Sequence, residues 1–428
     1  MRARRLHGVD AMRIRLAAIL VIFLGTSCSD GDVAPTGNGA GADAGTSGSP
    51  NGGAPDGSSS TSPPALLPDG APAPPGGGQS AAAKLATKLR GKATFLIGMG
   101  NDLASDHDKD GAYTLGTTLD LHYAYLVGLQ GQGGWPDWNP NGTFVNVLTD
   151  SAGAHGTTPM FTLYAMAAWG ENNLDVLTND AFMKRYFDGA RLLFQRLAAF
   201  GKPAVLHLEP DFWAFAQQGS PDATHAAHVT SLVPECAGIS NDLAGFGQCL
   251  LKLGRTIAPQ VAIGFHASSW SGDVGASIAF LKKLGADKAD FIATDLLDRD
   301  AGCFEAHTDP ACQRGGTTGW YLDESNATSP NYREALAWAK SIHDGLAVPV
   351  MWWQLPFGVP STTPGGTAGH YRDNKVRYLF AHVDEFVAAG GVGAVFGTGA
   401  GNQTYITTDD GQFKDAVTKY FAKPTPLP

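Results

Sequence analysis

Short β-rich runs alternate with longer helical patterns through most of this chain. The eight runs span 93–100, 119–127, 159–166, 203–210, 260–267, 290–297, 349–356 and 392–399. Helix-like stretches lie between them, among them 181–199, 243–257, 274–284, 332–345 and 372–389. Strands that alternate with helices form parallel sheets. Eight such units in roughly 310 residues predict an α/β fold, a closed (β/α)8 or TIM barrel. No G-x-G-x-x-G follows the first run, which argues against a dinucleotide-binding sheet.

The segment before the barrel has the features of an export signal. Arg13 and Arg15 precede an unbroken apolar run over 16–24, and small residues then lead to Cys28. This order is typical of a signal peptide, and the run is shorter than the ~20 residues that a membrane-spanning helix needs. The cysteine after small residues resembles the lipobox of bacterial lipoproteins, although the usual leucine lies one position too early. We expect residues 1–28 to be a signal peptide with lipidation at Cys28; ordinary secretion is the alternative.

Residues 29–83 are composed almost entirely of Gly, Ala, Ser, Pro, Thr, Asp and Asn. Such a segment has too little apolar surface to offset its ordering entropy, so we expect a disordered linker. Residues 84–428 then form the barrel domain. A protein built in this order is expected in the cell envelope or on the cell surface as a lipoprotein, and otherwise secreted.

The charge of the chain limits its partners. The formal net charge is -10, and no basic stripe of the kind that binds nucleic acid occurs. We therefore exclude nucleic acid as a partner and expect contact with a membrane only through the N-terminal lipid. We expect a monomer whose partner is a polysaccharide or oligosaccharide, for the reasons that follow.

Four cysteines besides Cys28 lie in the barrel domain. An even set in an exported protein predicts disulfides, and the local pairs Cys236–Cys249 and Cys303–Cys312 are the most economical of three connectivities. A zinc site is the alternative, but no C-x-x-C pair supports it. A D-x-D-x-D-G run, formed by Asp106, Asp108, Asp110 and Gly111, could hold a structural Ca²⁺ or form a solvated turn. No cofactor is expected to be required.

Tryptophan is concentrated where the predicted strands end. Eight of the nine tryptophans lie at or just after such an end: Trp135, Trp138, Trp169, Trp213, Trp270, Trp320, Trp352 and Trp353. Flat apolar rings with one N–H group suit the C–H faces of sugars and also line pockets in general. We expect two or three of them to pack loops and the others to stack on sugar rings.

The fourth run carries the most specific motif. His207, Glu209 and Asp211 are spaced by two, so we expect them to project from the same side of the strand. Glu209 followed by Pro210 resembles the acid/base position of a large clan of barrel glycoside hydrolases, where Asn usually precedes the pair and Leu208 stands here. The run is also similar to that of chitinase-like barrels, with His207 where they have Asp. A rim carboxylate paired for stability is the alternative.

Glycoside hydrolysis normally needs a second carboxylate. In the retaining clan this is a Glu at the end of strand seven, where this sequence has Gln354. An amide cannot form the glycosyl ester, so the sequence favours an inverting or atypical arrangement. The best second carboxylate is Asp295, which also resembles the Tyr-Asp position of the chitinase-like barrels. Asp211 is the other candidate.

These patterns predict an exported, lipid-anchored glycoside hydrolase with Glu209 as the general acid and Asp295 or Asp211 as its partner. Further side chains near predicted strand ends are expected to contact substrate: His122, Tyr125, Trp169, His207, Trp213, His266, Trp270, Trp353 and Gln354. The missing strand-seven Glu keeps a second function open, that of a non-catalytic glycan-binding lipoprotein. A barrel hydrolase or lyase acting on a non-sugar polymer is the third.

Overall fold

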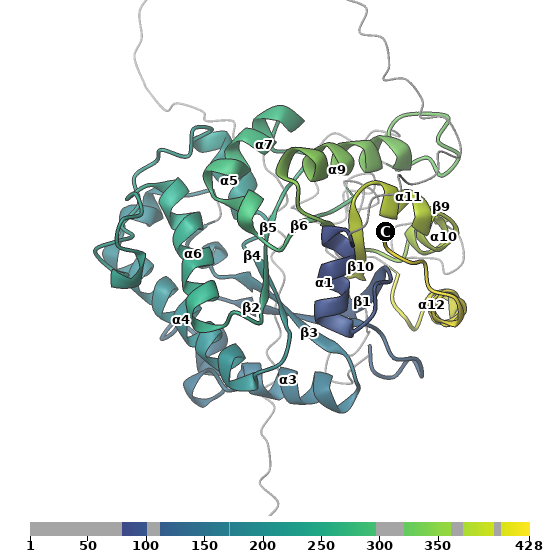
Figure 1. The fold of residues 1–428 in the computed structure, drawn as a ribbon, viewed down its shortest axis with the longest axis horizontal. Helices are drawn as coiled ribbons and strands as arrows, with labels where there is room; N and C mark the ends of the chain where they lie inside the picture. Colours follow the sequence, from purple (N-terminus) through teal and green to yellow (C-terminus); the bar gives the residue numbers. More distant parts are fainter. Residues whose placement is uncertain (1–78, 101–111, 171, 297–320, 361–370, 398–403) are drawn as a thin grey trace, which may run out of the picture. The chain divides into compact units, whose positions relative to one another are not determined.

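Eight parallel strands close into a barrel in the computed structural model, which describes residues 79–100, 112–170, 172–296, 321–360, 371–397 and 404–428 (Figure 1). The strand order around the barrel is β1-β10-β7-β6-β5-β4-β3-β2, which confirms the predicted (β/α)8 fold. Each of the eight β-rich runs supplies one strand: β1 Leu96–Gly100, β2 Leu121–Val127, β3 Thr158–Tyr164, β4 Val205–Leu208, β5 Ala262–His266, β6 Phe291–Thr294, β7 Val350–Leu355 and β10 Gly391–Phe396.

Helices surround the barrel and connect its strands. Their bounds are α1 Ala81–Arg90, α2 Trp135–Trp138, α3 Phe144–Ala154, α4 Asp180–Phe200, α5 Phe212–Gly219, α6 Leu243–Ile257, α7 Val274–Lys283, α9 Tyr332–Leu346, α10 Lys375–Ala381, α11 Val383–Ala388 and α12 Gln412–Ala422. The long connecting helices begin where a side chain can accept from the first free N–H groups. These caps are Asn179 for α4, Asp242 for α6, Asp273 for α7 and Asn331 for α9.

One helix prediction is wrong. The pattern over 372–389 was read as a single helix, but a short strand, β9 (Tyr371–Asp373), pairs with β8 (Val359–Pro360) before α10 begins. The helix is then interrupted at His382, whose backbone has φ -131° and ψ 30°. The His382 ring stacks on Tyr378 and its Nδ1 lies 3.1 Å from a Glu385 oxygen. These local contacts hold the non-helical residue that separates α10 from α11.

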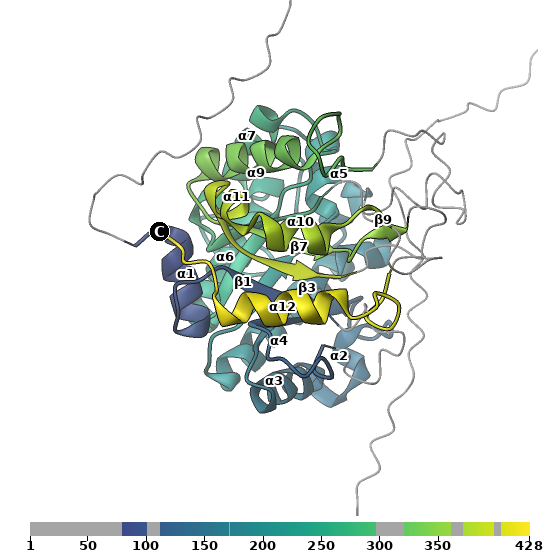
Figure 2. The same ribbon diagram turned by 90° about the vertical axis from the view of Figure 1, so that its right-hand side faces the viewer.

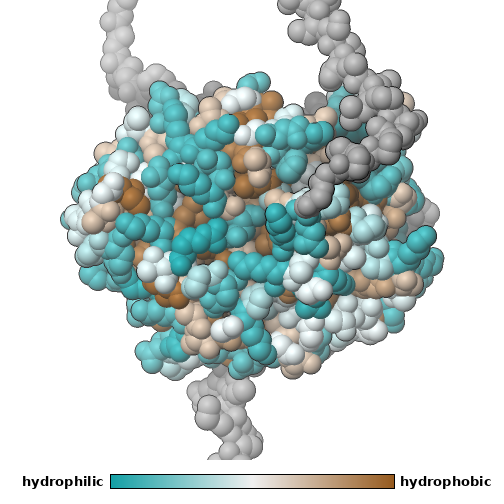
Figure 3. Space-filling view, viewed as in Figure 1, coloured by the Kyte–Doolittle hydropathy of each residue, from teal (hydrophilic) through white to brown (hydrophobic). Residues whose placement is uncertain are grey.

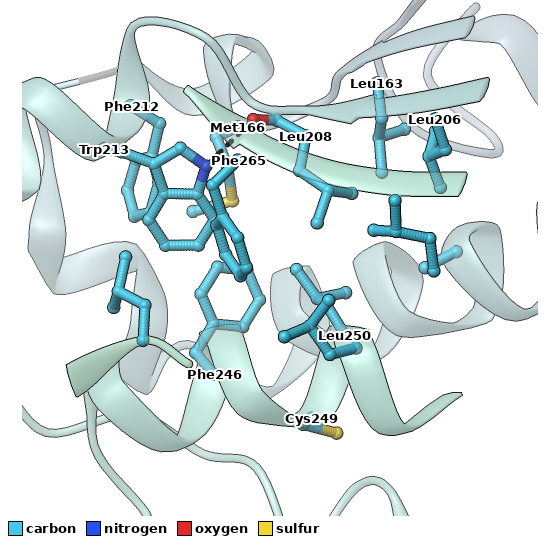
Figure 4. Close-up of a cluster of buried hydrophobic side chains, with 14 of the residues drawn as sticks. Leu163, Met166, Leu206, Leu208, Phe212, Trp213, Phe246, Cys249, Leu250 and Phe265 are labelled. Carbon is cyan, nitrogen blue, oxygen red and sulfur yellow. Dashed lines mark hydrogen bonds between the residues drawn. The ribbon is translucent and has the colours of Figure 1, made fainter. Parts of the chain in front are cut away.

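The buried hydrophobic residues form two clusters, one in the helix layer around β3, β4 and β5, and one that combines the barrel interior with the helix layer around β1, β7 and β10. On β4, Leu206 and Leu208 face the helices, whereas Val205 belongs to the cluster that includes the barrel interior. Trp213 lies in the outer cluster, where its ring packs near Phe246 of α6 and Phe265 of β5 (Figure 4). The helices present mainly hydrophilic side chains to the outside, with smaller hydrophobic areas between them (Figure 3). This is the arrangement expected of amphipathic helices around a buried sheet.

The two ends of the barrel domain are joined by backbone hydrogen bonds. Ser80 N donates to Pro428 O, Phe95 N donates to Thr425 O, and Leu427 N donates to Ala93 O. The C-terminus therefore lies beside α1, as Figure 2 shows. The chain after α12 is thus hydrogen-bonded to the segment that leads into β1.

The predicted disulfide Cys236–Cys249 is present, with a Cα–Cα distance of 5.5 Å. It joins the short helix Pro234–Cys236 to α6. Cys28, Cys303, Cys312, the aspartate run and residues 29–78 of the expected linker lie outside the described residues. The last residues assigned to the linker, 81–83, instead form the first turn of α1, where Ala82 and Ala83 are buried. Within the described ranges, no helix is long and apolar enough to cross a membrane.

Candidate active site

Aromatic and polar side chains converge on the barrel interior near the carboxyl ends of the strands, where active sites of this fold lie. The group that we call the mouth cluster consists of Tyr125, Tyr164, His207, His266, Trp353 and Gln354. The Trp353 ring is the centre of this group. Its centroid lies 4.7 Å from that of His207, 5.7 Å from that of Tyr125 and 5.8 Å from that of His266. Strands β2, β4, β5 and β7 are thus connected through one ring.

Two buried histidines form the floor of the mouth cluster. His207 Nε2 lies 3.1 Å from His266 Nδ1, and His207 Nδ1 lies 3.4 Å from Thr162 Oγ1. Burial, together with His266, lowers the pKa of His207 well below its usual value. His207 is therefore neutral at pH 7. A neutral His207 suits an uncharged polar ligand better than an ionic one.

Gln354 also belongs to the mouth, although the alternation of β7 would place it opposite Trp353. Its φ of +55° turns the side chain, and its Nε2 donates a hydrogen bond to the Tyr125 hydroxyl. The amide thus lies at the end of β7, beside Tyr125 of β2. It can bind a ligand hydroxyl, but it cannot attack an anomeric carbon.

Asp211 and Asp295 bring carboxylates to this end of the barrel. Tyr164, the last residue of β3, donates from its hydroxyl to Asp211 Oδ2 over 3.2 Å. Asp211 is the N-cap residue of α5, but its side chain makes no capping bond there. Ala293 of β6 is paired directly with His266, so both point to the barrel interior, and Asp295 follows two residues later.

Glu209 departs from the same-side prediction. Its φ is +42°, which breaks the alternation directly after β4. The carboxylate accepts from Ala165 N and Met166 N, each over 3.1 Å, and faces Tyr186 of α4. The expectation that Glu209 projects beside His207 is therefore wrong: His207 faces the interior and Glu209 the helix layer. The general-acid role of Glu209 stays a prediction, and Asp211 is the carboxylate that contacts the mouth cluster, through Tyr164.

Burial dominates the acid–base behaviour of Glu209. It raises the pKa of this carboxyl to about 8, although the two backbone N–H donors and Tyr186 act in the opposite direction. Desolvation of the charge outweighs these hydrogen bonds. Glu209 is thus mostly protonated at neutral pH, in a place with no exposed surface.

His122 was expected at the end of the second strand and lies instead near its beginning. It is the second residue of β2 and faces away from Tyr123, its inward-pointing neighbour. Its ring lies 4.4 Å from that of Tyr113, which stacks on His155 at 4.0 Å. Burial and His155 lower the pKa of His122 to about 4. The strand continues to Val127, so the pattern misplaced this residue by most of a strand length.

The tryptophans divide between packing and the rim. Trp135, Trp213 and Trp352 are fully buried, and Trp213 Nε1 donates to Leu208 O (Figure 4). Trp353 is enclosed by the rings of the mouth cluster and is 2 % exposed, so it has no open face for stacking. Trp169 and Trp270 lie on loops after β3 and β5; Trp169 is 46 % exposed and Trp270 is half-buried against Phe215. Trp320 lies outside the described residues.

Two residues of the site were missed from the sequence. Thr162 and Tyr164 lie two residues apart on β3, so both side chains point to the same side of the sheet. His207 of β4 is paired with Thr162 and points to that side too. The signal was present, because a tyrosine two residues after a threonine in a parallel strand continues one face. The expected run, 159–166, extends two residues beyond Tyr164, where β3 ends.

The described residues contain no group of three or more His, Cys, Asp or Glu side chains that could hold a metal ion.

No protein-family model and no curated protein sequence matches the chain. Solved structures with a similar fold include an endo-beta-1,4-mannanase from Thermotoga petrophila, at 14% identity over 78% of this chain and 77% of that one. The TM-score of this pair is 0.44.

A second similar structure is the catalytic domain of a beta-amylase from Paenibacillus polymyxa, at 11% identity over 78% of this chain and 99% of that one, with a TM-score of 0.44. A third is a D-allulose 3-epimerase from Methylomonas sp., at 13% identity over 77% of this chain and 98% of that one, with a TM-score of 0.42. These proteins differ in reaction, so likeness of this degree describes a barrel and does not indicate what it does.

Proposed function

We propose that this protein is an exported glycoside hydrolase, lipid-anchored through Cys28, that acts on an extracellular glycan with the mouth cluster as its site. The observation that carries the proposal is the hydrogen bond from Tyr164 to Asp211, beside the neutral His207 and the ring of Tyr125. Sugars present hydroxyl groups and apolar C–H faces together. A site with neutral hydrogen-bonding groups and aromatic walls complements both.

In this proposal Asp211 and Asp295 perform the acid–base chemistry. A hydroxyl that donates to a carboxylate favours its ionised form, so we assign Asp211 to the activation of water. Asp295 then protonates the leaving glycosidic oxygen. Water supplies the hydroxyl of the new anomeric centre, and the proton that it loses passes to Asp211. A water between the two carboxylates is the inverting arrangement, which does not require a carboxylate at Gln354.

Gln354 supports a second candidate, a glycan-binding protein without catalysis. Its amide holds the Tyr125 hydroxyl at the position of the missing nucleophile. In a binding protein, Gln354 and Tyr125 together would donate to and accept from sugar hydroxyls. This candidate uses the same mouth cluster, but Asp211 and Asp295 would contribute only hydrogen bonds.

One experiment separates the two candidates. The barrel domain, residues 79–428, is incubated with a panel of neutral and charged polysaccharides, and both reducing-end release and binding are measured. We expect sugar release from at least one neutral polysaccharide. Binding without release supports the glycan-binding candidate, and neither binding nor release across the panel contradicts both.

A further inference from the structure

Glu209 holds the loop that follows β3. Ala165 and Met166 are the first two residues after Tyr164, and their backbone N–H groups donate to the two different oxygens of the Glu209 carboxyl. A third bond, from Glu209 N to Leu163 O, extends the β3–β4 ladder by one residue. The beginning of this loop is therefore fixed to the end of β4 through both backbone and side chain.

The same loop carries an exposed tryptophan. Met166–Trp169 forms one 3-10 turn directly after the held residues. Trp169 is one of two large hydrophobic side chains that are exposed among the described residues, the other being Val147. Its ring packs edge-on against Phe182 in the first turn of α4, with centroids 5.6 Å apart and planes at 71°. One edge of the indole is thus fixed, and much of its surface is open to solvent.

The place of Trp169 in the fold relates it to the mouth. The helix α4 follows β3, so its first turn lies at the end of the barrel where the strands finish. Trp169 follows only five positions after Tyr164, which donates a hydrogen bond to Asp211. A flat, partly exposed ring on this rim is suited to the C–H face of a sugar outside the central site. Exposure of an apolar ring to water is unfavourable in free energy, and a ligand that covers the ring removes this exposure.

We propose that Glu209 is a positioning residue that fixes the Trp169 loop, and that Trp169 binds a distal sugar of a polymeric glycan. The inference rests on the proposed function and deepens it, because a subsite beyond the mouth selects long chains over short ones. Glu209 acts through the backbone of Ala165 and Met166 and does not touch the substrate. Trp169 makes the contact.

The positioning part is tested first on the unmodified barrel domain, without a ligand. Hydrogen–deuterium exchange should show strong protection of the Ala165 and Met166 amides, although both lie beyond the strand. In Glu209→Gln this protection should fall, because an amide nitrogen cannot accept an N–H bond. The positioning role is overturned if, in the wild type, the Ala165 and Met166 amides exchange as fast as exposed loop amides do. This outcome does not depend on what the protein binds.

The subsite part is tested with Trp169→Ala and the matched control Val147→Ala, which removes the other exposed hydrophobic side chain. KM for the polysaccharide should rise about threefold to tenfold in Trp169→Ala, with kcat and the KM for a short oligosaccharide unchanged. Glu209→Gln should raise the same KM, and the double variant should lose no more than Trp169→Ala alone. Equal KM values in Trp169→Ala and wild type, or additive losses, contradict the inference while leaving hydrolysis itself intact. A wild type without glycan activity contradicts the proposed function instead.

Discussion

Replacing Asp211 by Asn is expected to lower glycan hydrolysis by at least about 100-fold, because a positioned carboxylate contributes on the order of 10² to 10⁴ in rate. The amide oxygen of Asn can still accept from the Tyr164 hydroxyl, so the local structure and Tm should be retained. Initial rates of reducing-end release at saturating polysaccharide measure the effect. Binding of the same glycan should change little.

The control for this variant is Asp222→Asn, which alters an exposed aspartate paired with Lys283 after α5. It removes the same charge from the surface and should leave the rate unchanged. Tyr164→Phe gives a graded test, since it removes only the donor to Asp211 and should lower the rate about tenfold. Wild-type rates in Asp211→Asn would remove Asp211 from the chemistry.

The second large effect concerns the stability of Glu209→Gln. Both oxygens of the native carboxyl accept a backbone N–H, and a protonated carboxyl oxygen keeps a lone pair for this. The NH2 group of Gln cannot accept, so one buried N–H loses its partner at a cost of about 1–3 kcal/mol. We expect Tm to fall by at least about 3 °C. A general acid on the substrate would behave oppositely, with activity lost and Tm unchanged.

The pH dependence of this difference has a defined sign. The pKa of Glu209 is raised from 4.5 to about 8 by burial, so between these values the folded protein holds a proton that the unfolded chain has released. The stability of the wild type contributed by Glu209 is therefore fully present below about pH 4.5 and is lost as pH rises through about 8. Gln does not titrate. The Tm advantage of the wild type at pH 5 should therefore decrease as pH rises, reverse in sign before pH 8 and then stay constant, because a pKa shift of this size outweighs one lost hydrogen bond. A wild-type advantage that grows with pH would show that burial does not control this carboxyl.

The barrel could be predicted because its signals are local and repeated. Strand-length apolar runs recur eight times with helical patterns between them, and the parallel order then follows from chirality and short connections. The division of 372–389 into β9, α10 and α11 could not be predicted at its first residues, because β9 exists only through its pairing with β8. This pairing joins separate segments and leaves no signal within 372–389.

The candidate site was predicted in part for a related reason. A spacing of two places side chains together only while the backbone stays extended, which holds for Thr162 and Tyr164 on β3. It fails at Glu209 and Gln354, where positive φ values of 42° and 55° exchange the expected sides. No sequence pattern marks a positive φ at a Glu or a Gln. Residues at strand ends are therefore predicted less well than residues within strands.

The most direct test of the proposed function is a crystal structure of Asp211→Asn with a bound oligosaccharide that the wild type cleaves. We predict that the sugar lies over the mouth cluster, with the scissile oxygen next to Asp295 and a water between the anomeric carbon and residue 211. The side-chain amide at position 211 and the Asp295 carboxyl should be roughly 6.5–9.5 Å apart, the separation of the two carboxyls in an inverting enzyme. An oligosaccharide bound elsewhere, or one in the mouth with no water near residue 211 and no contact to Asp295, would contradict the proposed site.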